Sequence, residues 1–398
     1  MSVQLLLSPE GQDLLGSLPP YDAERAERAS RELRKAGWDP ALVSAALTQQ
    51  RLREKARLKL GDAADSMLFT EAGAQQATRA VVAGLHAARY VHAGCTNILD
   101  MTSGIGADAM AFARAGLDVT AVDLDPVTSS LAEWNLARFP GARAVNADAL
   151  TLDLGPFNGA FADPARRSGR GRTFDPAEYS PPLDRVLDVR RAIPALGVKV
   201  GPGIPYSALR ADTHAQWVSV DGDVVEAGLW FGPLAAVSGF DGPGRSALVI
   251  RTTAEGFEAT EVEASPDPRI PAQVVPTRPL GRYIYEPDGA VIRSGALHAL
   301  AAILDAGTVS EGIAYLTGNE LQLTALTTAF EVVDVVGFKQ VRSYCRERQV
   351  GSLEILKRGA DVVPDQFRRG LKLSGPHAAT VILTRLEGKH KAVFVRRI

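Results

Sequence analysis

The sequence predicts an α/β fold, in which a doubly wound parallel sheet follows a helical region and precedes a small α+β domain. Short apolar runs alternate with helical stretches between residues 97 and 200, a pattern typical of right-handed strand–helix–strand units. The composition is that of a folded chain, because 46% of the 398 residues are hydrophobic and 23% are charged. At about 150 residues per domain, the length indicates two or three domains.

Helices are expected in the first part of the chain. Their apolar residues recur at helical spacing, as in Ala26, Ala29, Leu33 and Ala36. Asp39-Pro40 interrupts this pattern, residues 41–60 continue it, and a further helix is predicted over 73–93. We therefore expect an N-terminal helical region over residues 1–66.

The predicted sheet begins at residue 97. Its first strands are expected at 97–100, 117–123, 142–145 and 159–162, with helices at 107–115 and 126–139 between them. Later strand-like runs are expected to complete the sheet, with antiparallel strands at one edge: 196–200, 215–220, 225–231, 246–251 and 257–262. The sheet domain is thus expected over residues 67–265.

The remaining chain divides into two expected segments. Five prolines lie between residues 263 and 281, and a helix is predicted over 291–304. We expect a linker with connecting elements over 266–324 and a compact α+β domain over 325–398.

Charge is distributed unevenly along the chain. Residues 331–398 hold 14 Lys and Arg against 7 Asp and Glu, whereas the other 330 residues hold 30 against 39. A basic terminal domain on an acidic body fits contact with a polyanion, and a solvated basic surface explains it equally well.

Several function classes find no support in the sequence. No apolar run approaches the roughly 20 residues of a membrane span, and the start lacks the features of a signal peptide. Cys95 and Cys345 are too few for a disulfide framework, and six scattered histidines predict no metal site. We expect a cytoplasmic protein that contacts no membrane and holds no metal.

A glycine turn at the end of the first strand carries the candidate site. Asp100 ends the strand, Gly104 and Gly106 let the backbone turn tightly against a ligand, and Asp123 ends the next strand. A carboxylate at that place can accept hydrogen bonds from both ribose hydroxyls of a nucleoside. Ligands of open α/β sheets bind at this edge.

Two nucleoside cofactors fit this turn. A dinucleotide site prefers G-x-G-x-x-G, and Ala109 at the third position is a tolerated substitution, so the glycines alone leave both cofactors open. Asp100 would repel a pyrophosphate, whereas it would attract the ammonium and sulfonium groups of S-adenosylmethionine. The electrostatics favour S-adenosylmethionine as the cofactor.

Residues 68–167 resemble a class I S-adenosylmethionine-dependent methyltransferase, which has a Rossmann-like sheet. Within that class they are most similar to the branch that contains the RNA cap guanine-N2 methyltransferases. The resemblance implies a cofactor site formed by matching residues: Phe69, Thr70, Asp100, Gly104, Gly106, Asp123 and Asp148. In that branch a phenylalanine–threonine segment closes over the cofactor, and the acid matching Asp148 meets the adenine amine. An Asp in a loop is also a common turn residue, which is the alternative for Asp148.

The fourth motif of the class is [D/N]-P-P-[aromatic], and Asp163-Pro164 matches its first half. The resemblance implies that Asp163 and the Pro164 carbonyl accept the hydrogens of an exocyclic amine and aim its lone pair at the methyl group. Ala165 replaces the second proline, and Arg166 replaces the aromatic that stacks the target base. Arginine planes also stack bases, so Arg166 keeps a catalytic role in this prediction.

The chain end resembles a THUMP-like domain over about 325–397, a module that accompanies RNA-modifying enzymes. The resemblance and the basic charge together favour RNA, either rRNA or tRNA, as the substrate. The expected nucleic-acid contacts are arginines of the loop after Asp163 and of the terminal domain: Arg167, Arg170, Arg358, Arg368 and Arg369. Two other functions stay open, namely a catalytically silent RNA-binding protein with this fold and a small-molecule methyltransferase.

Overall fold

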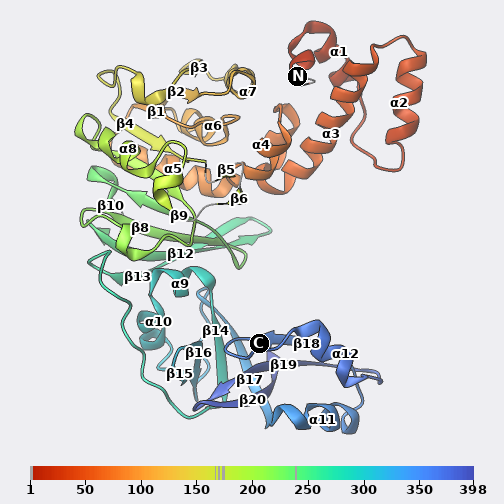
Figure 1. The fold of residues 1–398 in the computed structure, drawn as a ribbon, viewed down its shortest axis with the longest axis vertical. Helices are drawn as coiled ribbons and strands as arrows, with labels where there is room; N and C mark the ends of the chain where they lie inside the picture. Colours follow the sequence, from red (N-terminus) through yellow and green to blue (C-terminus); the bar gives the residue numbers. More distant parts are fainter. Residues whose placement is uncertain (1–2, 166, 169–170, 173–174, 238–239) are drawn as a thin grey trace. The chain divides into compact units, whose positions relative to one another are not determined.

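The computed structural model describes residues 3–165, 167–168, 171–172, 175–237 and 240–398. Its contacts divide the chain into two compact units (Figure 1). The first unit contains Met1–Val200 and Leu229–Asp241, and the second contains Gly201–Gly228 and Gly242–Ile398. The four segments expected from the sequence stay a prediction.

Helices form the start of the first unit, as the sequence predicts. They are the 3-10 helices η1 (Val3–Leu7) and η2 (Gly61–Ser66) and the α-helices α1 (Pro9–Ser17), α2 (Ala26–Lys35) and α3 (Pro40–Leu60). Helix α3 begins at Pro40 because the Asp39 carboxylate accepts the N–H groups of Ala41 and Leu42, both at 2.9 Å. It buries one face, including Val43 and Leu52.

A parallel sheet follows in the first unit, and it confirms the predicted α/β fold. Its strands are β1 (Asn97–Asp100), β2 (Asp118–Asp123), β3 (Ala142–Asn146), β4 (Gly159–Ala162) and β7 (Leu196–Val200), in the order β7-β4-β1-β2-β3. The helices of this part are α4 (Glu71–Gln76), α5 (Ala80–His92), α6 (Ala107–Arg114), α7 (Pro126–Leu136) and α8 (Leu183–Asp188). Short pieces complete the unit: β5 (Arg167–Ser168), β6 (Gly171–Arg172), β10 (Ala236–Val237) and β11 (Phe240–Asp241). The carboxyl ends of β1, β2, β4 and β7 meet at one edge of the sheet.

Two glycines let helix α5 pack closely on the sheet. A Cβ at Gly159 would lie 3.0 Å from the Tyr90 ring, and a Cβ at Gly197 would lie 2.6 Å from the Tyr90 hydroxyl. This hydroxyl donates to the carbonyl of Ala160 and accepts the N–H of Gly197 at 3.0 Å. Tyr90 therefore fixes α5 to β4 and β7.

The second unit begins with β8 (His214–Val220), β12 (Gly244–Thr253) and β13 (Gly256–Ser265). β12 pairs with β8 in parallel and with β13 in antiparallel orientation, which agrees with the antiparallel edge expected from the sequence. β9 (Asp223–Trp230) crosses the boundary between the units.

A seven-stranded sheet forms the C-terminal part of the second unit, in the order β15-β16-β14-β17-β20-β19-β18. The strands are β14 (Tyr283–Pro287), β15 (Gly307–Ser310), β16 (Ile313–Gly318), β17 (Thr327–Val336), β18 (Val350–Lys357), β19 (His377–Leu386) and β20 (Lys389–Arg397). The helices are α9 (Gly289–Ser294), α10 (Leu297–Ile303), α11 (Val341–Glu347) and α12 (Pro364–Leu371). β14, β15 and β16 come from residues 266–324, so this expected linker segment supplies three strands of the terminal sheet.

Candidate functional site

The glycine turn between β1 and α6 has the backbone that its sequence requires. Gly104 and Gly106 have φ values of +54° and +85°, a region that strains any residue with a Cβ. The Ser103 N–H donates to the Val122 carbonyl at 2.9 Å, which ties the turn to β2. The turn therefore lies at the strand edge where ligands of such sheets bind.

Asp123 braces this turn from the end of β2. Its carboxylate accepts the N–H of Gly104 at 3.1 Å and the N–H of Asp125 at 2.8 Å. The side chain is half-buried, and burial raises the pKa of Asp123 against the opposing effect of these two hydrogen bonds. Asp123 thus lies at the end of the second strand, as the sequence predicts, and it also holds the turn in shape through Gly104.

Asp100 is a buried carboxylate at the end of β1. Neither of its oxygens has a hydrogen-bond partner among the described residues, and the residue is only 1% exposed. Burial, and then the nearby charge of Asp108, raises the pKa of Asp100 well above its ordinary value. A carboxylate in this state favours a cationic ligand, because a cation would supply the missing partner.

The Phe69-Thr70 segment lies next to the glycine turn. Asn135 joins the two, because its Nδ2 donates to the carbonyls of Leu68 at 3.1 Å and Ile105 at 2.8 Å. Thr70 caps α4 by accepting the N–H of Gly73 at 2.9 Å. The Phe69 side chain is fully buried in the core, so in this conformation it offers a ligand no surface.

Asp148 is exposed after β3. Its carboxylate accepts the N–H of Leu150 at 2.9 Å and so begins the short helix η3 (Ala149–Thr151). This is the geometry of a turn residue, the alternative that the sequence left open. The hydrogen bond that caps η3 does not test whether Asp148 contacts the adenine of the cofactor, so this role stays a prediction.

Asp163 and Pro164 follow β4 directly. The Asp163 N–H donates to Thr102 Oγ1 at 2.6 Å, and its Oδ2 forms an ion pair with Lys199 Nζ at 2.6 Å. Pro164 is buried. Of the arginines that the sequence places here, Arg166 and Arg170 lie outside the described residues, and only the backbone of Arg167 is described, in β5.

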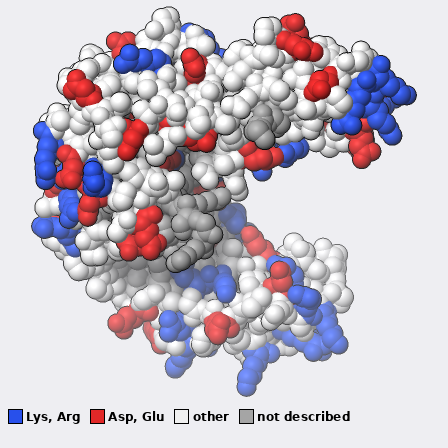
Figure 2. All heavy atoms as spheres, turned by 45° about the horizontal axis from the view of Figure 1, so that its top comes forward, with Lys and Arg blue, Asp and Glu red and all other residues white. Residues whose placement is uncertain are grey.

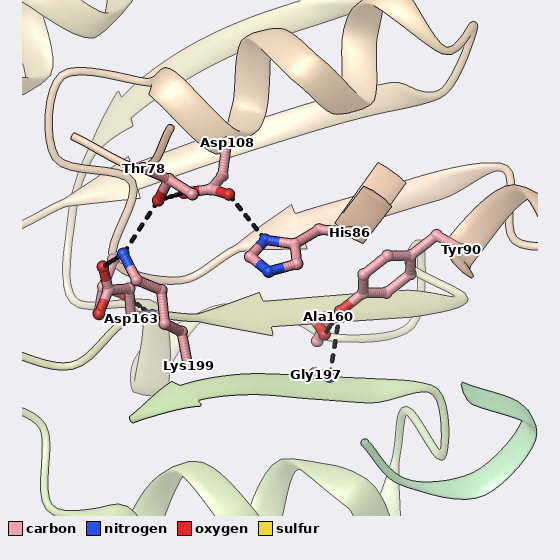
Figure 3. A network of polar contacts seen from close by, with 9 residues as sticks. Thr78, His86, Tyr90, Asp108, Ala160, Asp163, Gly197 and Lys199 are labelled. Carbon is pink, nitrogen blue, oxygen red and sulfur yellow. Dashed lines mark hydrogen bonds and ion pairs between the residues drawn. The ribbon is translucent and has the colours of Figure 1, made fainter. Parts of the chain in front are cut away.

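Four side chains behind Asp163 form a network that the sequence analysis missed (Figure 3). Lys199 Nζ donates to Thr78 Oγ1 at 2.9 Å, and Thr78 Oγ1 donates to Asp108 Oδ2 at 2.6 Å. His86 Nδ1 lies 3.0 Å from Asp108 Oδ1. We call Thr78, His86, Asp108, Asp163 and Lys199 the Lys199 network.

One sequence signal for this network exists. Lys199 is a charged residue within an otherwise apolar buried strand, and lysines are seldom buried without a partner. The partners come from positions 36 to 121 residues away, with no spacing that marks them.

The arginines of the terminal domain differ in how firmly they are held. Arg358 is half-buried, with its guanidinium 5.3 Å from the centre of the Tyr315 ring. Arg368 is exposed but bonds to Asp365 and to the Leu353 carbonyl, and Arg369 is exposed with one bond to the Asp365 carbonyl. In Figure 2, Lys and Arg side chains gather on this domain, in the lower part of the view.

Sequence comparison identifies the family. Two relatives from different strains of Mycobacterium tuberculosis are described as uncharacterized S-adenosylmethionine-dependent methyltransferases. Each is 33% identical over 349 residues, which cover 84% of this chain and 90% of the relative. The chain belongs to the S-adenosylmethionine-dependent methyltransferases.

Two family models match parts of this methyltransferase. A family described as THUMP domain-like matches residues 327–397, and a domain of unknown function (DUF8688) matches residues 1–56. The THUMP-like match confirms the resemblance inferred for the end of the chain.

A solved structure shares the fold of this methyltransferase. A Porphyromonas gingivalis protein assigned as a methyltransferase superposes with a TM-score of 0.72 and is 18% identical. The match covers 95% of this chain and 99% of that one. Within the described parts of this methyltransferase, no helix is long and apolar enough to cross a membrane, and His, Cys, Asp and Glu form no group of three that could hold a metal.

Proposed function

We propose that this methyltransferase transfers the methyl group of S-adenosylmethionine to an exocyclic or ring nitrogen of a base in RNA, either rRNA or tRNA. The observation that carries the proposal is the place of Asp163-Pro164, at the sheet edge that also holds Asp100 and Asp123. The THUMP-like domain at residues 327–397 supports RNA as the substrate.

The residues of the turn fit S-adenosylmethionine. The buried Asp100 carboxylate lacks a hydrogen-bond partner among the described residues, and the donor's ammonium group would supply one. Asp123 would accept from the ribose hydroxyls, Gly104 and Gly106 would let the backbone approach, and Thr70 and Phe69 would position the neighbouring segment. Asp148 would meet the adenine. When bound, the cofactor supplies an electrophilic methyl group.

Asp163 and Pro164 would hold the acceptor. The Asp163 carboxylate and the Pro164 carbonyl accept the hydrogens of an amine, which directs its lone pair toward the methyl group for in-line transfer. Arg166 would stack the target base in place of an aromatic side chain.

RNA would bind mainly through its phosphates. The proposed contacts are basic residues of the loop and of the terminal domain: Arg167, Arg170, Arg358, Arg368 and Arg369. The exposed Arg369 is the strongest candidate, because among the described residues its guanidinium bonds to a backbone carbonyl, that of Asp365, and forms no ion pair. The proposal includes a cytoplasmic location, which suits the two free buried cysteines, Cys95 and Cys345.

An Asp163→Ala variant tests the proposal. It should bind S-adenosylmethionine with nearly the affinity of the wild type and transfer no methyl group to RNA, because Asp163 faces the acceptor. Calorimetry with the donor and a filter assay with labelled donor and cellular RNA measure the two properties. Transfer that survives at saturating donor would contradict the role of Asp163.

The same assays separate the two other functions. A silent RNA-binding protein would bind the donor or RNA and label no acceptor. A small-molecule methyltransferase would place the label in the low-molecular-weight fraction of an extract and leave RNA unlabelled.

A further inference from the structure

Lys199 and Asp163 are brought together by the register of two parallel strands. Ala162 of β4 pairs with Val198 of β7, so the next residues, Asp163 and Lys199, follow side by side. Their side chains meet in the 2.6 Å ion pair, and the Lys199 side chain is only 12% exposed. A buried ammonium group destabilises a protein unless it is paired with an opposite charge. The ion pair with Asp163 therefore offsets the cost of burying Lys199.

The Lys199 ammonium is also held from the side opposite Asp163. Thr78 accepts from Lys199 and donates to Asp108, and Figure 3 shows this bridge between the two charged groups. Burial would raise the pKa of Asp108, but His86, Lys199 and Thr78 outweigh it, and the pKa lies below its ordinary value. Asp108 is therefore a carboxylate, and Lys199 lies between two acidic groups.

The network rests on a rigid support. His86 and Tyr90 lie four residues apart on α5, so they share one face of the helix. Tyr90 fixes this face to β4 and β7 through Ala160 and Gly197. The His86 ring packs 5.3 Å from Phe161, the strand residue two positions before Asp163. The strands that carry Asp163 and Lys199 thus also hold the helix that carries His86.

We propose that Lys199 is a positioning residue of the methyl-transfer site, which holds the Asp163 carboxylate in one orientation toward the acceptor. The proposal rests on the function proposed above for Asp163. An ammonium paired with one carboxylate and bridged to a second keeps its proton, so Lys199 acts as an anchor and not as a base. Displacement of a positioning group by about 1 Å can lower a rate about 100-fold. A residue that keeps the Asp163 carboxylate in place would therefore preserve the rate of transfer.

Lys199→Met tests this proposal, because it keeps the chain length and removes the charge. We expect kcat to fall about 10- to 100-fold, with the Kd for S-adenosylmethionine unchanged. The acid limb of the kcat profile should move to higher pH, because Asp163 loses the cation that stabilises its charge. Thr78 connects Lys199 to Asp108 of α6, and His86 of α5 lies 3.0 Å from Asp108. The charge of Asp163 also acts on Asp100 at the end of β1. Substitutions of Asp108, His86 or Asp100 should therefore shift the same kcat profile.

A double variant separates positioning from general disruption. If Lys199 acts through the charge of Asp163, then in an Asp163→Asn background Lys199→Met should lose most of its effect. Equal loss of kcat in both backgrounds would overturn the proposal. So would an acid limb that disappears in Lys199→Met instead of moving to higher pH, because that limb would then belong to Lys199 acting as the base.

Thr78→Val tests the bridge behind Lys199. Loss of the hydroxyl should lower kcat about 2- to 10-fold without a change in donor affinity. Thr213→Val is the matched control, because Thr213 is fully buried and its hydroxyl has no partner among the described residues. If Thr78→Val has the kcat of the Thr213→Val control, the bridge is not part of the positioning.

The acceptor assay keeps the two proposals apart. Rates are measured on whichever fraction of a cell extract takes label from the donor, RNA or small molecules. Label in small molecules alone would refute the RNA function, and the double variant would still decide the role of Lys199. Label in neither fraction would overturn both.

Discussion

Replacement of Asp123 by alanine should weaken donor binding and also loosen the glycine turn. The variant loses the bonds to the N–H groups of Gly104 and Asp125, at 3.1 and 2.8 Å. Bonds to a charged group contribute about 1.5–3 kcal/mol each when buried. Because Asp123 is only half-buried, we expect a total loss of about 1–3 kcal/mol in the free energy of unfolding. This corresponds to a decrease of about 2–12 °C in Tm.

The effect on donor binding should be at least as large as the effect on the fold. Asp123 is the proposed acceptor for the ribose hydroxyls, and loss of these charge-assisted bonds costs about 1.5–3 kcal/mol. The Kd for S-adenosylmethionine should rise about 10- to 100-fold. Isothermal calorimetry measures this Kd, and circular dichroism on the same samples shows that the variant is folded.

Asp123→Asn is the matched control for the turn. It keeps one acceptor oxygen and should keep more of the stability than alanine, while donor affinity still falls. A folded Asp123→Ala variant with the donor affinity of the wild type would refute the assignment of Asp123 to the donor site.

Three further predictions address the rest of the molecule. Donor binding should release a proton from Asp100, because its pKa is raised in the free protein and a bound ammonium favours the ionised form. Affinity should therefore rise as the pH passes from about 4 toward the raised pKa, and calorimetry in buffers of different ionisation enthalpy should detect a release that Asp100→Asn abolishes. Over the same range the stability of the free protein should fall, since its ionised carboxyl is the disfavoured form. Gly197→Ala should cost about 1–3 kcal/mol in urea unfolding because its Cβ would lie 2.5 Å from the Trp230 ring, whereas Gly84→Ala, with nothing within 4 Å, should not destabilise. Arg369→Gln should lower the salt dependence of RNA binding by about 0.7–0.9 in the log–log slope, and an unchanged slope would exclude Arg369 from phosphate contact.

The strand order of the terminal domain determines which variants can test its role in RNA binding. Removal of residues 326–398 would take β17, β18, β19 and β20 from the seven-stranded sheet and leave β14 without its partner β17. Charge variants such as Arg369→Gln leave that sheet intact. They therefore separate RNA binding from stability better than truncation does.

The strands of the parallel sheet and the glycine turn could be predicted from sequence because their signals are local. Asp100, Gly104 and Gly106 lie within seven residues, and their types follow from a tight turn at a strand end. The second role of Asp123, as a brace for Gly104, depends on a hydrogen bond across 19 residues, and no residue type marks it.

The Lys199 network could not be predicted, because it is made by packing. Lys199 meets Asp163 through strand register and meets Thr78 across 121 residues. His86 is one of six scattered histidines in the sequence, and only the folded chain shows its contact with Asp108. Packing also determines the position of Phe69. Its motif implies a place over the cofactor, whereas its ring lies in the hydrophobic core.

The central claim is methyl transfer to a base in RNA, and nucleoside analysis tests it most directly. RNA from cells that lack this protein is incubated with S-adenosylmethionine labelled in its methyl group, digested to nucleosides and separated by chromatography with mass detection. The label should appear in one N-methylated base with the wild type and be absent with Asp163→Ala. Label in a ribose or only in small molecules, or equal labelling by Asp163→Ala, would contradict the claim.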